Sequence, residues 1–158
     1  MATSLKNLSE QSVSRKIDLS DKAFAIVVSE WNDEITESLF EAAHQTLLNH
    51  GAKKQRIIRR NVPGSFELTL GAQRMAENKK IDAVICLGCV IQGETRHFDF
   101  ICDAVANGLT QVGLKFNKPV IFGVLTPNTF QQALDRAGGK HGNKGDEAAV
   151  TAIKMLGF

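Results

Sequence analysis

The residues best suited to chemistry stand together in the stretch Gly88–Asp99, where an apolar run gives way to a polar turn. His97 follows the turn, and histidine side chains have a pKa of about 6.5 in water, which suits proton transfer near neutrality. Gly93, Glu94 and Thr95 supply a flexible glycine and a hydroxyl. A strand that leads into a helix through such a turn leaves free N–H groups, which favour an anion. We predict an active-site corner here, although a histidine that only caps or fills the helix start fits the local pattern too.

Three cysteines raise the questions of redox chemistry and metal binding. Cys86 and Cys89 have the C-x-x-C spacing, but a thioredoxin-like pair sits at a helix N-terminus, whereas these two lie inside an apolar run. A zinc site would also need His97 and Cys102, and residues three apart on a strand point to opposite faces. We therefore expect the cysteines to serve packing, and we expect no metal.

The elements that must position these residues alternate between strands and helices. Apolar runs predict buried strands at 23–29, 83–91 and 120–125, and a less apolar run predicts a strand near a sheet edge at 56–62. Apolar spacings of three and four predict helices that carry Ile35 to Leu47, Leu68 to Ala76, Phe98 to Phe116 and Ala148 to Leu156. Four strands alternating with helices predict a flavodoxin-like, three-layer α/β/α sandwich with a four-stranded parallel sheet.

Cap residues mark where several helices begin. Asn32 or Asp33 can cap the first helix, and Ser65 can cap the second after the sharp Pro63-Gly64 turn. Thr129 and Gln132 fit a capping box, which predicts a short helix to about Ala137. The glycine-rich stretch 138–145 then breaks the chain, and it has neither the P-loop order nor a G-x-G-x-x-G pattern.

Length and composition narrow the class of protein. With 158 residues and 43% hydrophobic content, the chain supports one domain, 21–158, after an N-terminal arm, 1–20. A net charge of +2 without clustered basic residues argues against nucleic acid. No apolar run reaches the roughly 18 residues of a membrane span, and the N-terminus lacks the apolar core of a signal peptide. We expect a cytoplasmic protein without a nucleic-acid or membrane partner.

Parallel sheets bind ligands at the carboxyl ends of their strands. Four groups of residues are predicted to fall at that edge: Trp31, 63–67, 88–97 and Thr126. Four blocks of the sequence, three of them at this edge, resemble the 6,7-dimethyl-8-ribityllumazine synthase family, which catalyses the penultimate step of riboflavin biosynthesis. The blocks are Val62–Glu67, Leu87–Asp99, Pro119–Thr126 and Arg136–Gly145, within a match from about Phe24 to Leu156.

The resemblance implies the lumazine synthase fold and a transferase. The reaction it implies condenses 5-amino-6-(D-ribitylamino)uracil with 3,4-dihydroxy-2-butanone 4-phosphate, releases phosphate and water, and needs no metal or organic cofactor. Taken alone, the residues leave two other functions open: a non-catalytic carrier of a flavin-like ligand, and a shell-forming structural protein.

The resemblance also implies roles for single residues. Trp31 is implied to stack on the pyrimidine ring, and Asn32 lies next to it in the sequence. The ribityl chain is implied to bind at Ser65, Phe66 and Glu67. The strand end Cys89, Val90 and Ile91 is implied to contact the uracil. Glu67 also fits a simple complement to the helix dipole. Phosphate binding is implied for Glu94 and Thr95, and proton transfer for His97. Neighbouring subunits are implied to contribute Phe122 and Arg136, and Lys144 is a further candidate near the site.

Assembly follows from the same resemblance. A site shared between subunits implies rings, here pentamers, because a repeating head-to-tail contact closes or makes a filament. The short connection Gly138–Gly145 resembles that of members that form an icosahedral shell of sixty chains, with riboflavin synthase as a candidate partner. Glu30 and Gln92 stand where many members have arginine, and Arg96 returns some of that positive charge.

Overall fold

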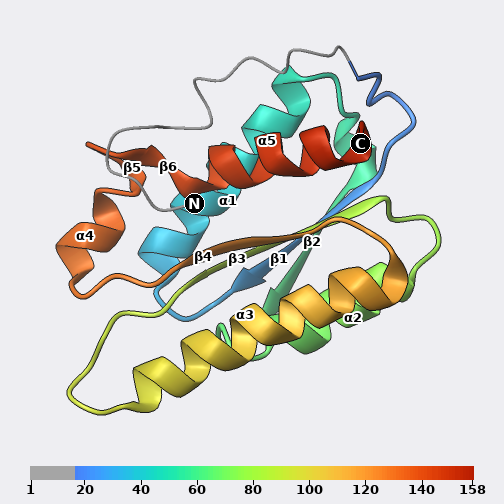
Figure 1. Cartoon of the computed structure of the whole chain (residues 1–158). Coiled ribbons are helices and arrows are strands. Elements are labelled where there is room, and N and C mark those ends of the chain that lie inside the picture. Colours follow the sequence, from blue (N-terminus) through green and yellow to red (C-terminus); the bar gives the residue numbers. More distant parts are fainter. Residues whose placement is uncertain (1–16) are drawn as a thin grey trace.

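Four parallel strands form the centre of the computed structural model, which describes residues 17–158 (Figure 1). They are β1 (Phe24–Ser29), β2 (Ile57–Val62), β3 (Ala83–Cys89) and β4 (Val120–Leu125), in the order β2-β1-β3-β4. Helices α1 (Asp33–Asn49) and α5 (Lys144–Leu156) cover one face, while α2 (Leu68–Glu77) and α3 (His97–Phe116) cover the other (Figure 1). The predicted three-layer sandwich is confirmed, and β2 is an edge strand as predicted.

Burial follows the position of each strand in the sheet. Every residue of β1 and β3 is buried, because both strands have a neighbour on each side and helices on both faces. The register pairs Phe24 with Ile57 on one side and with Ala83 on the other. A strand enclosed in this way reads as a continuous apolar run, which is why the sequence pattern identified it.

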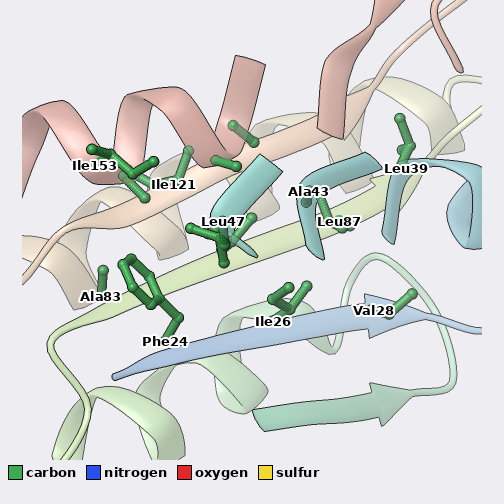
Figure 2. Packing of buried hydrophobic residues seen from close by; sticks show 14 of the residues in the cluster. Phe24, Ile26, Val28, Leu39, Ala43, Leu47, Ala83, Leu87, Ile121 and Ile153 are labelled. Carbon is green, nitrogen blue, oxygen red and sulfur yellow. The ribbon is translucent and has the colours of Figure 1, made fainter. Parts of the chain in front are cut away.

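Two hydrophobic clusters fill the space between the sheet and its helices. Successive side chains of a strand point to opposite faces, so Phe24, Ile26 and Val28 pack toward α1 and α5 (Figure 2). Ala25 and Val27 pack toward α2 and α3. Each fully buried Leu, Ile or Phe side chain contributes about 1.5–3 kcal/mol relative to exposure. The sheet is therefore held from both sides, and its carboxyl end is a rigid platform.

The stretch from 130 to 145 differs from the prediction. Helix α4 (Phe130–Leu134) ends before Ala137, and the glycine-rich break is a small hairpin of β5 (Ala137–Gly139) and β6 (Gly142–Asn143). Gly138 and Gly142 have φ of 108° and 74°, which favours glycine. The carboxamide of Asn143 donates to the backbone oxygen of Ser38 at 3.2 Å, so contact with α1 holds the hairpin in place.

The three predicted caps have different outcomes. At the start of α1, Asp33 Oδ1 accepts from the N–H of Glu34 at 3.0 Å. Asn32 occupies the N-cap position of α1, but its φ of 60° is left-handed and its side chain makes no cap hydrogen bond. The Ser65 hydroxyl is buried and has no hydrogen-bond partner among residues 17–158, and α2 begins only at Leu68. Thr129 is confirmed, since its Oγ1 accepts from the N–H of Gln132 at 3.2 Å. The Oε1 of Gln132 accepts from the N–H of Asn128 at 2.8 Å, one residue before the cap.

The predicted arm, 1–20, lies mostly outside the described residues. Of its last four residues, Leu19 is 1% exposed and belongs to the α1/α5 cluster, and Ile17 packs against the same cluster. A short 3-10 helix, η2 (Lys54–Arg56), leads into β2. Within residues 17–158, no helix combines the length and apolar character that crossing a membrane requires.

Candidate active site

The carboxyl ends of the four strands meet at one edge of the sheet. Three loops at this edge carry most of the predicted site residues: the β1–α1 loop, the β2–α2 turn and the β3–α3 loop (Figure 1). Figure 1 shows these loops at the end of the sheet toward which the strand arrows point. The structure thus places the residues from Trp31 to His97 on loops at the edge that the sequence predicted.

The β1–α1 loop joins three strand ends. The N–H of Glu30 donates to Val62 O at 2.8 Å, and the N–H of Trp31 donates to Pro63 O at 3.2 Å. On the other side, Nδ2 of Asn32 donates to Cys89 O at 3.0 Å. The Trp31 side chain is 72% exposed on this clamped backbone. An indole held in this way offers a flat face for stacking on a heterocycle.

The β2–α2 turn presents one buried and two exposed side chains. Ser65 packs under β3, where a Cβ added to Gly88 would lie 2.6 Å from the Ser65 Oγ. Phe66 and Glu67 are exposed, and Glu67 is the N-cap residue of α2. Its carboxylate folds over Gly64, because a Cβ there would lie 3.1 Å from Glu67 Oε2. A ligand at this turn therefore meets Phe66 and Glu67, while Ser65 anchors the turn.

The end of β3 places its side chains on both faces. Cys86 packs toward α2 and α3, and Cys89 packs toward α1 and α5. The prediction that they face opposite ways is confirmed, so the two thiols cannot share a metal. Burial raises the pKa of Cys89 to about 12 and raises that of Cys86 further. Both thiols are protonated at neutral pH and unsuited to nucleophilic chemistry.

Beyond β3, the chain continues alongside the end of β4. The N–H of Val90 donates to Leu125 O at 2.8 Å, and that of Gln92 donates to Pro127 O at 3.0 Å. Val90 and Ile91 are partly buried against opposite clusters. Val90 and Ile91 have no polar side-chain atoms, so only their backbone groups can hydrogen-bond a ligand, whereas the side chain of Gln92 is exposed.

The β3–α3 turn is open to solvent. Glu94, Thr95 and His97 are all exposed, and α3 begins at His97, one residue before the predicted start. Thr95 Oγ1 accepts from the N–H of His97 at 3.4 Å, which leaves the hydroxyl proton free to donate to an anion. Arg96 contacts Asp99, with Nε and Oδ2 3.5 Å apart.

Phe122, Arg136 and Lys144 come from the part of the chain that follows α3. Phe122 is 41% exposed on the edge strand β4, and with Lys144 it lines a groove of about 640 Å³ between α3, β4 and α5. Arg136 Nη1 donates to Gln132 O at 3.0 Å, and Arg136 O accepts from the N–H of Lys144 at 2.8 Å. We therefore distinguish the strand-end group, from Trp31 to His97, from the β4-side group of these three residues.

The sequence reasoning missed Glu147. Its carboxylate lies 2.7 Å from Lys144 Nζ, and both residues line the groove beside Phe122. Glu147 is 8% exposed, so this is a mostly buried ion pair. The sequence did contain a signal for this ion pair, because a lysine and a glutamate stand three residues apart at the start of the last helix.

Known proteins resemble the chain over its whole described length. A family model described as 6,7-dimethyl-8-ribityllumazine synthase matches residues 21–158. A protein of that name from Cytophaga hutchinsonii is 68% identical over 157 residues, which cover 99% of this chain and 98% of the relative. One from Parabacteroides distasonis is 56% identical over 158 residues, with 100% and 99% covered. One from Flavobacterium johnsoniae is 54% identical over 155 residues, with 98% and 82% covered. The family resemblance is thereby confirmed, and the chain belongs to the 6,7-dimethyl-8-ribityllumazine synthase family.

Proposed function

We propose that the strand-end group is the site at which this enzyme condenses 5-amino-6-(D-ribitylamino)uracil with 3,4-dihydroxy-2-butanone 4-phosphate. The product is 6,7-dimethyl-8-ribityllumazine, with release of phosphate and water. The observation that carries the proposal is the convergence of Trp31, Glu67 and His97, all exposed, from three loops at one sheet edge. Family membership does not favour a non-catalytic carrier.

The two ends of the uracil substrate meet different surfaces in this proposal. The exposed indole of Trp31 stacks on the pyrimidine, with Asn32 beside it, and the backbone of Cys89–Ile91 contacts the ring. The ribityl hydroxyls bind at 65–67, where the Glu67 carboxylate accepts hydrogen bonds. Ser65 supports this segment by packing under Gly88.

The phosphate binds at the start of α3. Exposed N–H groups of the turn, the Thr95 hydroxyl and the positive end of a 20-residue helix all favour an anion. Glu94 lies on this turn, and a neighbouring subunit adds Arg136, whose planar guanidinium suits phosphate oxygens. Lys144, whose Nζ lies 2.7 Å from Glu147 Oε2, is a further candidate near the site.

His97 transfers protons during imine formation and phosphate elimination, and holding both substrates at the edge supplies proximity. His97 is exposed in the first turn of α3, the helix whose start we propose as the phosphate site. We expect His97→Ala to lower turnover by about 10- to 1,000-fold, because proximity remains. Lumazine absorbance and phosphate release measure this, and full turnover at neutral pH would rule out the role.

The exposure of Phe122 within the edge strand β4 supports a homo-oligomer with sites between subunits. Phe122 packs against the ring from a neighbour in this proposal, and the subunits close into pentamers. The short hairpin β5–β6 favours further assembly into a sixty-chain shell, with riboflavin synthase as a candidate partner. Analytical ultracentrifugation distinguishes pentamers from shells.

Complementation tests the shared site directly. His97→Ala and Arg136→Ala each weaken one half of the site, so co-assembled chains should form some sites with both halves intact. Turnover in verified mixed pentamers should exceed that of either variant alone. Equal turnover would mean that each site is built within one chain. Arg136→Ala alone should mainly raise the KM for the phosphate substrate.

A further inference from the structure

Asn32 adopts a backbone conformation that most residues avoid. Its φ of 60° and ψ of 50° are left-handed, a region that glycine and asparagine tolerate and other L-residues rarely enter. The residue stands between the exposed Trp31 and the first turn of α1. A reversal of the chain at this point fixes the direction in which the backbone of Trp31 leaves the sheet.

The side chain of Asn32 extends the pairing of β1 with β3. The regular register ends at Val28 and Leu87. The Asn32 carboxamide then donates to Cys89 O at 3.0 Å, while the Val90 N–H of the same peptide unit points the other way, to Leu125 O. Cys89 is 1% exposed, so its carbonyl would lose this partner at a cost if the amide were removed.

Trp31 has little packing of its own to hold its orientation, since it is 72% exposed. Its backbone N–H is bound to Pro63 O on the β2 side, and the residue after it is bound to Cys89 O on the β3 side. Ser29 Oγ also donates to Trp31 O at 3.4 Å, within the β1–α1 segment. Of these three attachments, only the one from Asn32 joins this segment to the end of β3. The Nδ2 of Asn32 is already committed to one of them.

We infer that Asn32 is a positioning residue, which sets the place of the Trp31 indole over the end of β3 through its left-handed backbone and its bond to Cys89 O. This inference rests on the proposed function for the role of Trp31. It also refines the prediction that Asn32 binds substrate: the residue acts on the uracil substrate through Trp31.

Trp31 is the single tryptophan of the chain, so intrinsic fluorescence reports on it alone. The test compares the free wild-type enzyme with Asn32→Gly, which keeps the backbone conformation and removes the amide, and Asn32→Asp, which removes the donor at nearly constant size. We expect both variants to show lower Trp31 fluorescence anisotropy from faster local motion. We expect the KM for the uracil substrate to rise about three- to thirtyfold, with the KM for the phosphate substrate within about twofold of wild type.

Asn78→Asp is the matched control, because Asn78 follows α2, near the amino end of β3, and its Oδ1, which accepts from Lys80 N–H, is retained. It should leave both the anisotropy and the KM unchanged. Asn32→Ala removes both features and should have the largest effect; if it does not fold, Asn32→Gly and Asn32→Asp still decide.

Wild-type anisotropy in both variants would overturn the inference, even with a raised KM, because a direct ligand would lower affinity without freeing the indole. An inactive wild-type enzyme would instead overturn the proposed function. The anisotropy of the free protein needs no substrate and would still decide the positioning role.

Discussion

The two edge strands of the sheet are built differently. On β2, the guanidinium of Arg59 binds the carboxylate of Glu37 and lies 4.3 Å over the ring of Phe40, and Arg60 and Asn61 are exposed beside it. On β4, Phe122 is 41% exposed above a groove that ends at Phe158, whose side chain is fully exposed. Charged side chains on an edge strand discourage pairing with another chain, whereas an exposed apolar patch marks an interface.

In the proposed assembly, this difference favours β4 as the edge that a neighbouring subunit covers. The ion pair on β2 is partly exposed and contributes no more than about 1 kcal/mol, so its value at the edge lies in excluding partners rather than in stability. The groove on β4 carries Leu114 and Met155, which are 79% and 47% exposed. These apolar side chains gain free energy only when another surface covers them.

The largest effect should come from placing a charge on the β4 edge. We expect Phe122→Asp to leave a folded chain that sediments near its mass of 17.2 kDa and turns over at least about 100-fold more slowly. Analytical ultracentrifugation and the turnover assay measure both.

The matched control puts the same carboxylate on the other edge. Asn61→Asp on β2 should leave the sedimentation and the turnover unchanged, because Asn61 is exposed and an aspartate can still accept from Arg59 Nε. If Asn61→Asp dissociated the assembly and Phe122→Asp did not, our assignment of the two edges would be reversed.

Lys118, just before β4, is a useful contrast because its ammonium group binds backbone carbonyls of its own chain. Lys118 Nζ donates to Ala76 O and Asn78 O, both at 2.8 Å, and so satisfies carbonyls at the end of α2. We expect Lys118→Met to lower the free energy of unfolding by about 1–2 kcal/mol without dissociating the assembly.

Urea unfolding at a fixed protein concentration measures this effect, because association changes the apparent stability. The control is Lys79→Met, at an exposed position just after Asn78, which should change stability by less than about 0.5 kcal/mol. Equal losses in the two variants would show that Lys118 is not a helix cap.

The smallest effect should appear on β2. A hydrogen bond from Arg59 lowers the pKa of Glu37 below its ordinary 4.5, so the pair stabilises the fold above that pH and the gain is lost as the pH falls through the lower folded-state value. We expect Glu37→Gln to cost under about 1 kcal/mol at pH 7, and nothing in acid or high salt. A cost that persisted below the folded-state pKa would reflect packing rather than charge.

Much of the fold could be predicted from local patterns. β1 and β3 are apolar throughout because they are enclosed, and the stripe of α3 ends at Phe116 as its spacing indicates. The hairpin β5–β6 could not be predicted in this way, since it is held by hydrogen bonds to Ser38, which is far away in the sequence. Ser65 looked like a cap because the space that Gly88 leaves for its hydroxyl is invisible in the local sequence.

The site residues also divide into those that local sequence predicts and those that it does not. The position of His97 after a buried strand predicted the carboxyl edge, because sheet topology places such loops together. The hydrogen bond from the Asn32 amide to Cys89 O on β3 requires a left-handed backbone at Asn32. Asparagine permits that conformation but does not dictate it. The distance of Phe122 from this edge follows from its position within β4. Only the family resemblance had placed it in the site, from a neighbour.

The docking of α5 on α1 has a consequence for synthesis of the chain. A Cβ on Gly145 would lie 2.0 Å from Leu39 O, so the last helix lies directly on the backbone of the first. Ala149 and Ile153 from this helix complete the cluster that Phe24 begins. A growing chain cannot close that cluster while these residues are still inside the ribosome. Helix α1 covers β1 early, but β3 and β4, on which α5 lies, keep part of that face uncovered until the last helix emerges.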